Sequence, residues 1–285
     1  MSKGARRIPP QIREPFEKPA VSIASYYVKV SVADVRAYPS EQEELVTQAL
    51  LGDEIRIIED ENDWVQAEVP DGYIGWIKKD TIVKTIPPKY EDIVAITAPS
   101  TKLYQDPGLK VIGEALLGTD VPYLDENNKW FKVWVPGQGS VWVLKKDAEL
   151  WPDGKVPDTP RSGEDVINVA NRLRGVHYLW GGVSRYGIDC SGLVYVSYFL
   201  NGIKLPRDAD QQFEVGQEVE KRDLEPGDLV FFNTDGFDSV PTHVGIYLKN
   251  GYFINSRSRM GVVISHLNEP IFVKGYLGAR RYLQK

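Results

Sequence analysis

The stretch Tyr178-Leu-Trp-Gly-Gly-Val-Ser-Arg-Tyr-Gly-Ile-Asp-Cys-Ser-Gly-Leu-Val194 contains Cys190, the single cysteine among 285 residues. Glycines crowd the segment before the cysteine, and the apolar residues 193–200 follow it before Gly202. We expect a glycine-rich loop that delivers Cys190 to the first turn of a helix, which Gly202 ends. Unpaired backbone N–H groups and the positive end of the helix dipole would then favour the thiolate and could hold an oxyanion.

A lone cysteine is more often a small buried hydrophobe than a nucleophile. Here Asp189 and Ser191 place polar groups on both sides of Cys190, and no apolar run precedes it. This context favours a nucleophile, provided that a general base lies close to the thiol in the folded chain.

Composition limits the class of protein. An apolar content of 42% and a charged content of 26% predict a soluble globular chain of two or three domains. The net charge of −6 argues against nucleic-acid partners and gives no polybasic membrane anchor. One cysteine excludes an intrachain disulfide framework and a multi-cysteine zinc site. Without a visible signal peptide or transmembrane span we expect a cytoplasmic protein, although a secreted protein stripped of its leader would look the same.

An internal repeat divides the first half of the chain. Residues 1–25 form a proline-rich tail, and short β-rich runs with frequent turns follow it. Four anchors recur at an offset of 115 − 49 = 66 positions: Ala49-Leu-Leu-Gly52 as Ala115-Leu-Leu-Gly118, Trp64 as Trp130, Val69-Pro70 as Val135-Pro136, and Trp76 as Trp142. Lys79-Asp80 returns one residue later, as Lys146-Asp147. We predict two tandem all-β modules, residues 26–84 and 90–150, and the simplest interpretation of the tryptophans is that both in each module belong to its core.

The remaining residues, 161–285, change pattern from helix to strand. Ser162 caps a helix with Asp165 three residues on, and Gly175 ends it. Strands are predicted later, at residues 228–232, 243–248, 252–255, 262–264 and 276–282. Helices followed by an antiparallel sheet make an α+β domain.

A catalytic thiol needs a base and a third polar group that orients the base. Of the three histidines, His177 precedes the glycine loop and His266 looks like a turn residue, whereas His243 opens a strand. We expect the ring of His243 to face the helix of Cys190; the alternative is an ordinary histidine at a strand start.

The segment Lys249-Asn-Gly251 predicts a hairpin after that strand. A two-residue turn would place Asn255 on the face opposite His243. A three-residue turn with Gly251 as a left-handed bulge residue would pair Gly245 with Asn255 and bring Asn255 and His243 to one face. We predict the bulged turn, with Asn255 accepting a hydrogen bond from the imidazole.

These segments resemble the NlpC/P60 family of papain-like cysteine peptidases. The resemblance is carried by Tyr178-x-Trp-Gly-Gly182, Asp189-Cys-Ser-Gly-Leu193, Pro206-Arg207, Gln211-Gln212, Pro226-Gly-Asp-Leu-Val-Phe-Phe232 and His243-Val-Gly-Ile-Tyr247. It implies that Cys190 is the nucleophile and His243 the base. The family usually has a second histidine in an Ile-His-Ala setting, where this chain has Ile254-Asn-Ser256.

The two β modules are similar to bacterial SH3 domains, which have a closing Gly-x-x-Gly-Trp-Ile, here Gly72 to Ile77. The second copy has Gly139-Ser-Val-Trp142 and is a looser match. With these modules in front, the chain resembles γ-D-glutamyl-L-diamino-acid endopeptidases of the bacterial cell wall.

The resemblance also implies contacts with the substrate. Tyr178 would line the pocket of the nucleophile, and Asp189 and Ser191 would face the peptide. In the first module Glu44 and Tyr73 would read the free amine of an N-terminal L-Ala; the alternative is a solvated acid and a core tyrosine.

We therefore expect a monomeric hydrolase, without metal or cofactor, that cuts peptidoglycan-derived peptides before meso-diaminopimelate or lysine. Two other functions stay open. One is an amidase or acyl transferase on the same scaffold, and the other is a wall-binding protein whose last domain is inert.

Overall fold

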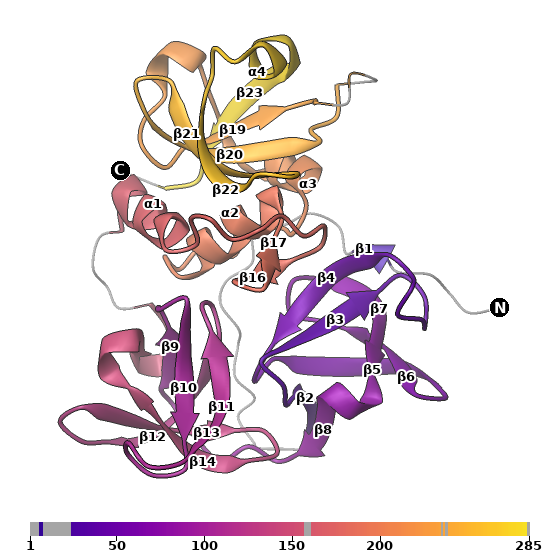
Figure 1. Ribbon diagram of the computed structural model, residues 1–285, viewed down its shortest axis with the longest axis vertical. Coiled ribbons are helices and arrows are strands. Elements are labelled where there is room, and N and C mark those ends of the chain that lie inside the picture. The colour runs from indigo at the N-terminus through magenta and orange to yellow at the C-terminus, as the bar shows by residue number, and fades with distance from the viewer. Residues whose placement is uncertain (1–5, 8–23, 157–160, 235, 237–238, 284–285) are drawn as a thin grey trace. The chain divides into compact units, whose positions relative to one another are not determined.

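A computed structural model describes residues 6–7, 24–156, 161–234, 236 and 239–283. The chain divides into two compact units, with the boundary next to Pro157 (Figure 1). Most of the tail predicted at residues 1–25 lies outside the described residues. The exceptions include β1 (Arg6–Arg7), which pairs with a strand of the first barrel.

The first unit holds two β barrels with the same strand order (Figure 1). The first barrel runs through β2 (Ser25–Val28), β3 (Val32–Arg36), β4 (Leu45–Leu50), β5 (Glu54–Glu61), β6 (Trp64–Glu68), β7 (Tyr73–Lys78), η1 (Lys79–Thr81) and β8 (Ile82–Thr85). The second runs through β9 (Ile93–Ile96), β10 (Ser100–Tyr104), β11 (Val111–Leu116), β12 (Asp120–Glu126), β13 (Trp130–Val135), β14 (Gly139–Leu144), η2 (Lys145–Asp147), β15 (Ala148–Trp151) and η3 (Pro152–Gly154). The orders β4-β3-β7-β6-β5-β2-β8 and β11-β10-β14-β13-β12-β9-β15 match strand for strand.

The barrels confirm the repeat and correct one of its details. Trp64 faces Lys78 across β6 and β7, and Trp130 faces Leu144 at the equivalent place in the second barrel. The short helices η1 and η2 begin 66 positions apart, so Lys79 corresponds to Lys145 and not to Lys146. The sequence match one residue later was wrong because two lysines stand side by side in the second copy.

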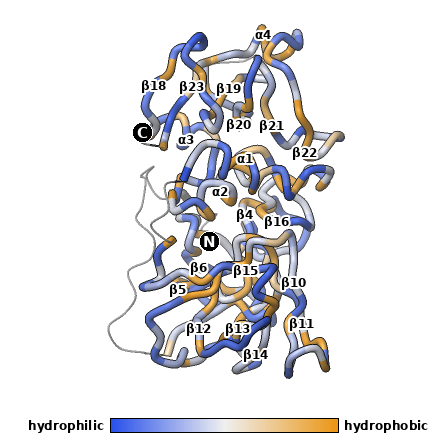
Figure 2. Tube along the Cα trace, turned by 90° about the vertical axis from the view of Figure 1, so that its left-hand side faces the viewer, coloured by the Kyte–Doolittle hydropathy of each residue, from blue (hydrophilic) through white to orange (hydrophobic). Residues whose placement is uncertain are grey.

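Alternating side chains build the barrel cores. In β13 buried residues alternate with partly exposed ones, as expected for a strand with one face inside. Trp76 is fully buried, whereas Trp64, Trp130 and Trp142 are each partly exposed, so not every tryptophan belongs wholly to a core. Figure 2 shows the orange, hydrophobic stretches along the strands of the barrels.

The second unit is the predicted α+β domain. Its helices are α1 (Gly163–Asn171), α2 (Cys190–Phe199), α3 (Ala209–Val215) and α4 (Pro270–Gly275), with η4 (Lys221–Asp223). The antiparallel sheet has the order β18 (Gln217–Val219), β23 (Tyr276–Arg281), β19 (Leu229–Phe232), β20 (His243–Lys249), β21 (Tyr252–Arg257) and β22 (Gly261–His266). Helix α2 packs on β20 and β21, which brings the cysteine helix onto the strands of His243 and Asn255.

The predicted cap of α1 is present, but the end of the helix was placed too late. Ser162 and Asp165 form a capping box, and Ser162 also lowers the pKa of the Asp165 carboxyl through hydrogen bonds from its backbone and hydroxyl. The helix ends at Asn171, before Gly175, since residues 172–174 continue as a turn. Within the described residues no helix is long and apolar enough to cross a membrane.

Candidate active site

The glycine-rich loop delivers Cys190 to the first position of α2, as the sequence predicts. The loop folds into a small hairpin of β16 (Val183–Ser184) and β17 (Gly187–Ile188). A side chain at Gly192 would lie 2.2 Å from the carbonyl oxygen of Gly182, so only glycine lets the loop pack this closely on the helix. Gly202 has a φ of +81° just after α2 and ends it.

Asp189 caps α2 and binds a buried arginine. Its Oδ1 accepts a hydrogen bond from the Gly192 amide at 2.6 Å, and its Oδ2 accepts one from the Gly181 amide at 2.8 Å. Arg207 donates to Oδ1 at 3.0 Å and to Oδ2 at 2.7 Å. Because Arg207 is only 1% exposed, this bidentate pair fixes the start of the cysteine helix from inside the domain.

Ser191 belongs to the same cluster. Its hydroxyl lies 3.2 Å from Asp189 Oδ1 and accepts a hydrogen bond from Arg207 at 2.9 Å. Asp189 and Ser191 are each 6% exposed, so both side chains are held by protein groups in the structure described here. Their contact with substrate remains a prediction.

The sequence reasoning gave no role to Arg207, although it quoted Pro206-Arg207 as a motif. A signal was available. An aspartate expected at a helix start beside an apolar segment needs a counter-ion when it is buried, and arginine suits a two-oxygen partner best.

The thiol of Cys190 lies against the strand that carries the histidine. The backbone N–H groups of Val244 and Ser191 both face the sulfur. Burial raises the pKa of the thiol to about 12, and Asp189 adds to the rise, while the two N–H groups and Arg207 oppose it. The helix start therefore acts in the expected direction, but burial outweighs it and the resting thiol is protonated.

His243 and Asn255 meet as predicted. His243 Nε2 lies 2.9 Å from Asn255 Oδ1, and the two residues are 8% and 0% exposed. Phe272 stacks on the His243 ring, with 5.8 Å between the centroids and 21° between the planes, which restricts the ring to one orientation.

The predicted pairing register of the His243 and Asn255 strands is confirmed, but the predicted three-residue turn is wrong. Ile246 pairs with Ile254, as the bulged hairpin requires. The turn itself has only two residues, Asn250 and Gly251, both with positive φ of 52° and 83°. The extra residue is Leu248, where the register of β20 shifts between Tyr247 and Lys249.

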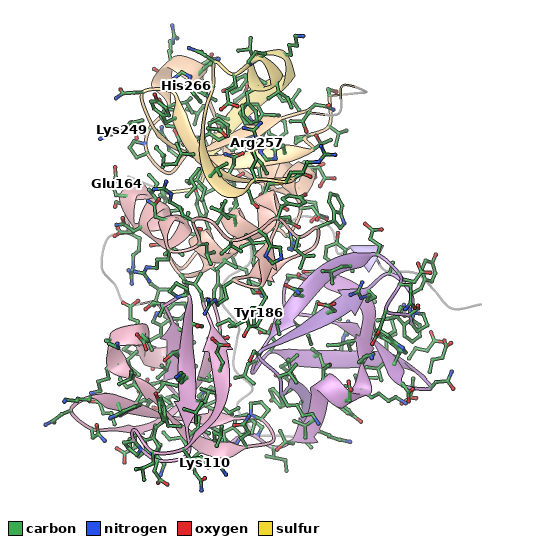
Figure 3. The ribbon with its side chains drawn as sticks, viewed as in Figure 1. Lys110, Glu164, Tyr186, Lys249, Arg257 and His266 are labelled. Atoms are coloured by element: carbon green, nitrogen blue, oxygen red, sulfur yellow. The ribbon has the colours of Figure 1, made fainter. Side chains whose placement is uncertain are left out.

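The other two histidines lie elsewhere. His177 is exposed in the chain before the loop. His266 is the last residue of β22, with its Nε2 3.2 Å from the Asn250 carbonyl oxygen and its ring edge-on to Tyr252. Figure 3 labels His266 in the part of the ribbon formed by the second unit.

Aromatic side chains line the outside of the loop. Tyr178, predicted to line the pocket, is half-buried, and Trp180 and Tyr186 are 58% and 44% exposed. Exposed tryptophan beside a nucleophile is a usual sign of a ligand surface, and the sequence reasoning did not select Trp180.

Glu44 and Tyr73 belong to the first barrel, in the other unit. Glu44 is exposed just before β4, and its carbonyl oxygen accepts a hydrogen bond from the Ala37 amide. Tyr73 is 8% exposed and packs into the barrel core with Val35 and Ile77. The role of both residues in reading an amine remains a prediction.

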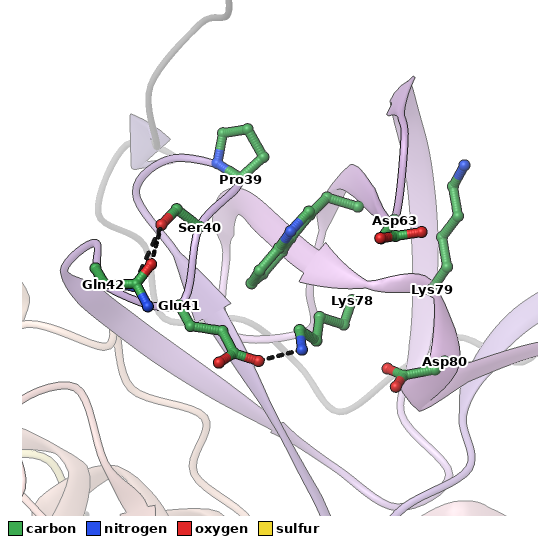
Figure 4. Close-up of a pocket in the computed structure, with 9 residues that line it drawn as sticks. Pro39, Ser40, Glu41, Gln42, Asp63, Lys78, Lys79 and Asp80 are labelled. Carbon is green, nitrogen blue, oxygen red and sulfur yellow. Dashed lines mark hydrogen bonds and ion pairs between the residues drawn. The ribbon is translucent and has the colours of Figure 1, made fainter.

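The first barrel also has a surface pocket of about 530 Å³ (Figure 4). Its lining combines the apolar rings of Trp64 and Pro39 with charged and polar side chains: Ser40, Glu41, Gln42, Asp63, Lys78, Lys79 and Asp80. Lys78 pairs with Glu41, and its ammonium lies 5.8 Å from the centroid of the Trp64 ring. Among the described residues of the whole chain no group of histidine, cysteine and carboxylate side chains is arranged to hold a metal ion.

A thiol at the start of a buried helix, facing a strand that carries an imidazole–amide pair, defines the cysteine-peptidase class of site. Residues 175–281 match the NlpC/P60 family, and residues 35–82 match the bacterial dipeptidyl-peptidase Sh3 domain. The chain belongs to the NlpC/P60 family of cysteine peptidases.

Two relatives cover most of the chain. A gamma-D-glutamyl-L-lysine dipeptidyl-peptidase of Bacillus cereus is 33% identical over 90% of this chain and 81% of its own length. A protein of the same name from Bacillus subtilis is 34% identical over 82% of this chain and 80% of its own. The crystal structure of an NlpC/P60 family protein from Bacillus cereus matches with a TM-score of 0.82 and 28% identity, over 91% of this chain and 100% of that one.

Proposed function

We propose that the protein is an endopeptidase that hydrolyses the amide between the γ-carboxyl of D-glutamate and an L-diamino acid in peptides derived from peptidoglycan. The observation that carries the proposal is the His243–Asn255 pair on β20 and β21, next to the Val244 amide that faces the Cys190 thiol. The names of the two Bacillus relatives support the bond type.

The geometry defines the order of proton transfers. With Asn255 Oδ1 accepting from His243 Nε2, the proton of the neutral ring is on Nε2, and Nδ1 is the nitrogen that would take the thiol proton. Because burial keeps the Cys190 thiol protonated, His243 must remove that proton as the sulfur attacks the γ-carbonyl carbon. Asn255 then stabilises the imidazolium, as the third member of a triad does.

The second half of the reaction reverses these transfers. The imidazolium of His243 gives its proton to the leaving amine, and the L-diamino acid departs from the thioester on Cys190. Water, deprotonated by His243, attacks the thioester carbon, and the γ-carboxylate of D-glutamate and the Cys190 thiol are regenerated.

We further propose that the substrate must have a free N-terminal amine on its L-Ala residue. A carboxylate such as that of Glu44 is the natural partner of an ammonium group. A peptide still attached to the glycan has a lactyl group on this nitrogen and no amine, so the substrate would be a released fragment. We propose a monomer acting on such fragments.

The test is hydrolysis of L-Ala-γ-D-Glu-L-Lys and its meso-diaminopimelate analogue, followed by mass spectrometry of the free diamino acid. We expect release by the wild type and none above background by Cys190→Ala, because no other thiol is present. If neither protein releases the diamino acid and the wild type binds to cell-wall sacculi, the result would favour a wall-binding protein. Equal rates on N-acetylated peptide would overturn the requirement for a free amine.

A further inference from the structure

The pocket of the first barrel lies where the Trp64 ring meets three segments of the chain (Figure 4). These are the loop between β3 and β4, the start of β6, and the end of β7 with η1. The loop has eight residues, 37–44, against six, 105–110, in the second barrel. A pocket of about 530 Å³ is large enough for a small molecule, and an aromatic ring with a few polar groups is a usual lining. The second barrel, which has the same strand order, shows which of these features the fold itself requires.

The second barrel places other side chains around its own tryptophan, Trp130. Strand pairing makes Trp130 the counterpart of Trp64, and an equivalent backbone hydrogen bond follows in each barrel, from the first residue of the short helix to the residue before the tryptophan. Three polar positions of the pocket then differ: Asp63, Lys78 and Asp80 correspond to Lys129, Leu144 and Lys146. The two acids of the first barrel have cationic counterparts in the second, so the fold does not require them.

The two tryptophans also differ in what covers them. Tyr104, the last residue of β10, packs edge-on against Trp130 with 5.0 Å between the ring centroids. Arg36, the last residue of β3, has the same place in the first barrel, but its guanidinium donates to the Glu43 carbonyl oxygen at 2.8 Å. Among the described residues no aromatic ring contacts Trp64, and the exposed part of this ring therefore borders the pocket.

The charged groups of the pocket leave both donors and acceptors for a ligand. Lys78 pairs with Glu41, and its ammonium lies 5.8 Å from the centroid of the Trp64 ring. An ammonium has three donors, so this pair does not use all of them. Asp63 and Asp80 line the same pocket and are exposed, and in the part of the chain that the structure describes their carboxylates accept no hydrogen bond and form no ion pair.

We propose that this pocket binds a short saccharide built of pyranose rings. The apolar C–H face of a pyranose suits the rings of Trp64 and Pro39. Its hydroxyl groups can donate to the carboxylates of Asp63 and Asp80 and accept from the Lys78 ammonium. The ammonium that already lies at the ring would repel a cationic ligand, and the two carboxylates would repel an anionic one. A neutral ligand rich in hydroxyl groups matches both kinds of charge.

The direct test is the ¹H–¹⁵N spectrum of the indole N–H groups of the full chain, with the signal of Trp64 assigned through Trp64→Phe. The probes are cellobiose and N,N′-diacetylchitobiose, which share the β-1,4-linked pyranose pair and differ in the acetamido groups. We expect at least one of them to move the Trp64 signal in a saturable way, with a Kd on the order of 1 mM. The signal of Trp130, which Tyr104 covers, is the internal control and should not move.

Two variants place the residues of the second barrel in the pocket of the first. Asp63→Lys and Asp80→Lys change exposed side chains and should leave the barrel folded. Each should raise the Kd of the bound disaccharide at least about tenfold, because each removes an acceptor for its hydroxyl groups. Glu59→Lys is the matched control: it makes the same change of charge on an exposed residue of β5 that does not line the pocket, and the Kd should stay that of the wild type.

The outcomes decide the proposal without any hydrolysis. A Trp64 signal that neither disaccharide moves would overturn it, as would a Kd unchanged in both Asp63→Lys and Asp80→Lys. A shift caused by the diamine cadaverine but by neither disaccharide would show a cation site instead. The pocket belongs to the first unit, whereas Cys190 belongs to the second. Failure of this site therefore leaves the proposed peptidase standing, and loss of the peptidase leaves this site standing.

Discussion

The Asp189–Arg207 pair of the catalytic domain and the Glu41–Lys78 pair of the first barrel join the same kinds of charge in different surroundings. The side chains of Asp189 and Arg207 are 8% and 1% exposed, and further hydrogen bonds surround them. Those of Glu41 and Lys78 are 61% and 37% exposed at the rim of the pocket in Figure 4. The first pair is withdrawn from water and the second is not.

The difference shows where this chain uses charge to hold a structure. Water and salt screen an exposed pair, which therefore contributes little to stability. A buried pair is costly to assemble, but breaking it leaves an uncompensated charge inside the protein. The catalytic domain places such a pair directly beneath the nucleophile, whereas the barrels have their ion pairs at the surface.

Removal of the Arg207 side chain should have the largest effect on the stability and activity of the catalytic domain. In Arg207→Met the Asp189 carboxylate stays buried without its partner, and the free energy of unfolding of the catalytic domain should fall by about 3–5 kcal/mol. Hydrolysis should fall with it because Asp189 also caps the helix of Cys190. Urea unfolding followed by tryptophan fluorescence measures the first effect and the peptide assay the second.

Arg281 provides the control for that variant. It binds Asp228 through two bonds of 2.7 Å but is 18% exposed and lies on the sheet. Because the Asp228 side chain is 2% exposed, Arg281→Met also leaves a buried carboxylate without its partner and should destabilise the domain to a similar degree, but it should leave kcat per folded molecule unchanged. Equal losses of kcat per folded molecule in both variants would show that the position of the Asp189–Arg207 pair beneath Cys190 has no special importance.

The Cys190 thiol provides a second measure of burial in the catalytic domain, through the pH dependence of its ionisation. Its pKa is raised to about 12 in the fold from an ordinary value of 9.0, so the unfolded chain loses the proton first. The stability that this shift contributes is present below pH 9 and is lost as the pH rises through 12. Alkylation by iodoacetamide should accordingly stay slow from pH 6 to about pH 9 in the native protein and accelerate as the pH approaches 9.0 in the unfolded chain. A native rate that is already maximal at pH 6 would show an ion-paired thiolate instead.

The smallest effect belongs to the barrel surface. Lys79 pairs with Asp60, and Lys145 pairs with Glu126 at the equivalent place in the second barrel. The substitution Lys79→Ala or Lys145→Ala should shift the melting temperature by no more than about 2 °C. The shift should vanish in high salt. A loss of stability in either lysine variant as large as that in Arg207→Met would contradict the distinction between exposed and buried ion pairs.

The sequence predicted the parts of the site that depend on local pattern. The glycine loop, the helix start at Cys190 and the register that pairs Ile246 with Ile254 all follow from residue spacing. The position of the bulge residue could not be predicted from spacing. An extra residue at Leu248 in the strand and an extra residue at Gly251 in the turn give the same register. Alternation on a half-buried strand specifies register more strongly than it specifies the bulge.

The residues that the sequence did not predict act over long separations. Arg207 meets Asp189 across 18 positions and follows no periodic pattern. Ser265 reaches Asn255 only through the pairing of β21 and β22. The helices α3 and α4 were also missed, since they have seven and six residues and too few turns to show a helical period.

The most direct test of the account is the covalent intermediate. Wild-type protein mixed with L-Ala-γ-D-Glu-L-Lys, quenched in acid and analysed by mass spectrometry should carry an L-Ala-γ-D-Glu group on the peptide that contains Cys190. The same adduct on His243→Ala should be absent or far weaker, because the thiol would keep its proton. Turnover of the substrate without an adduct on Cys190, and at an undiminished rate in Cys190→Ala, would contradict the central claim that this thiol is the nucleophile.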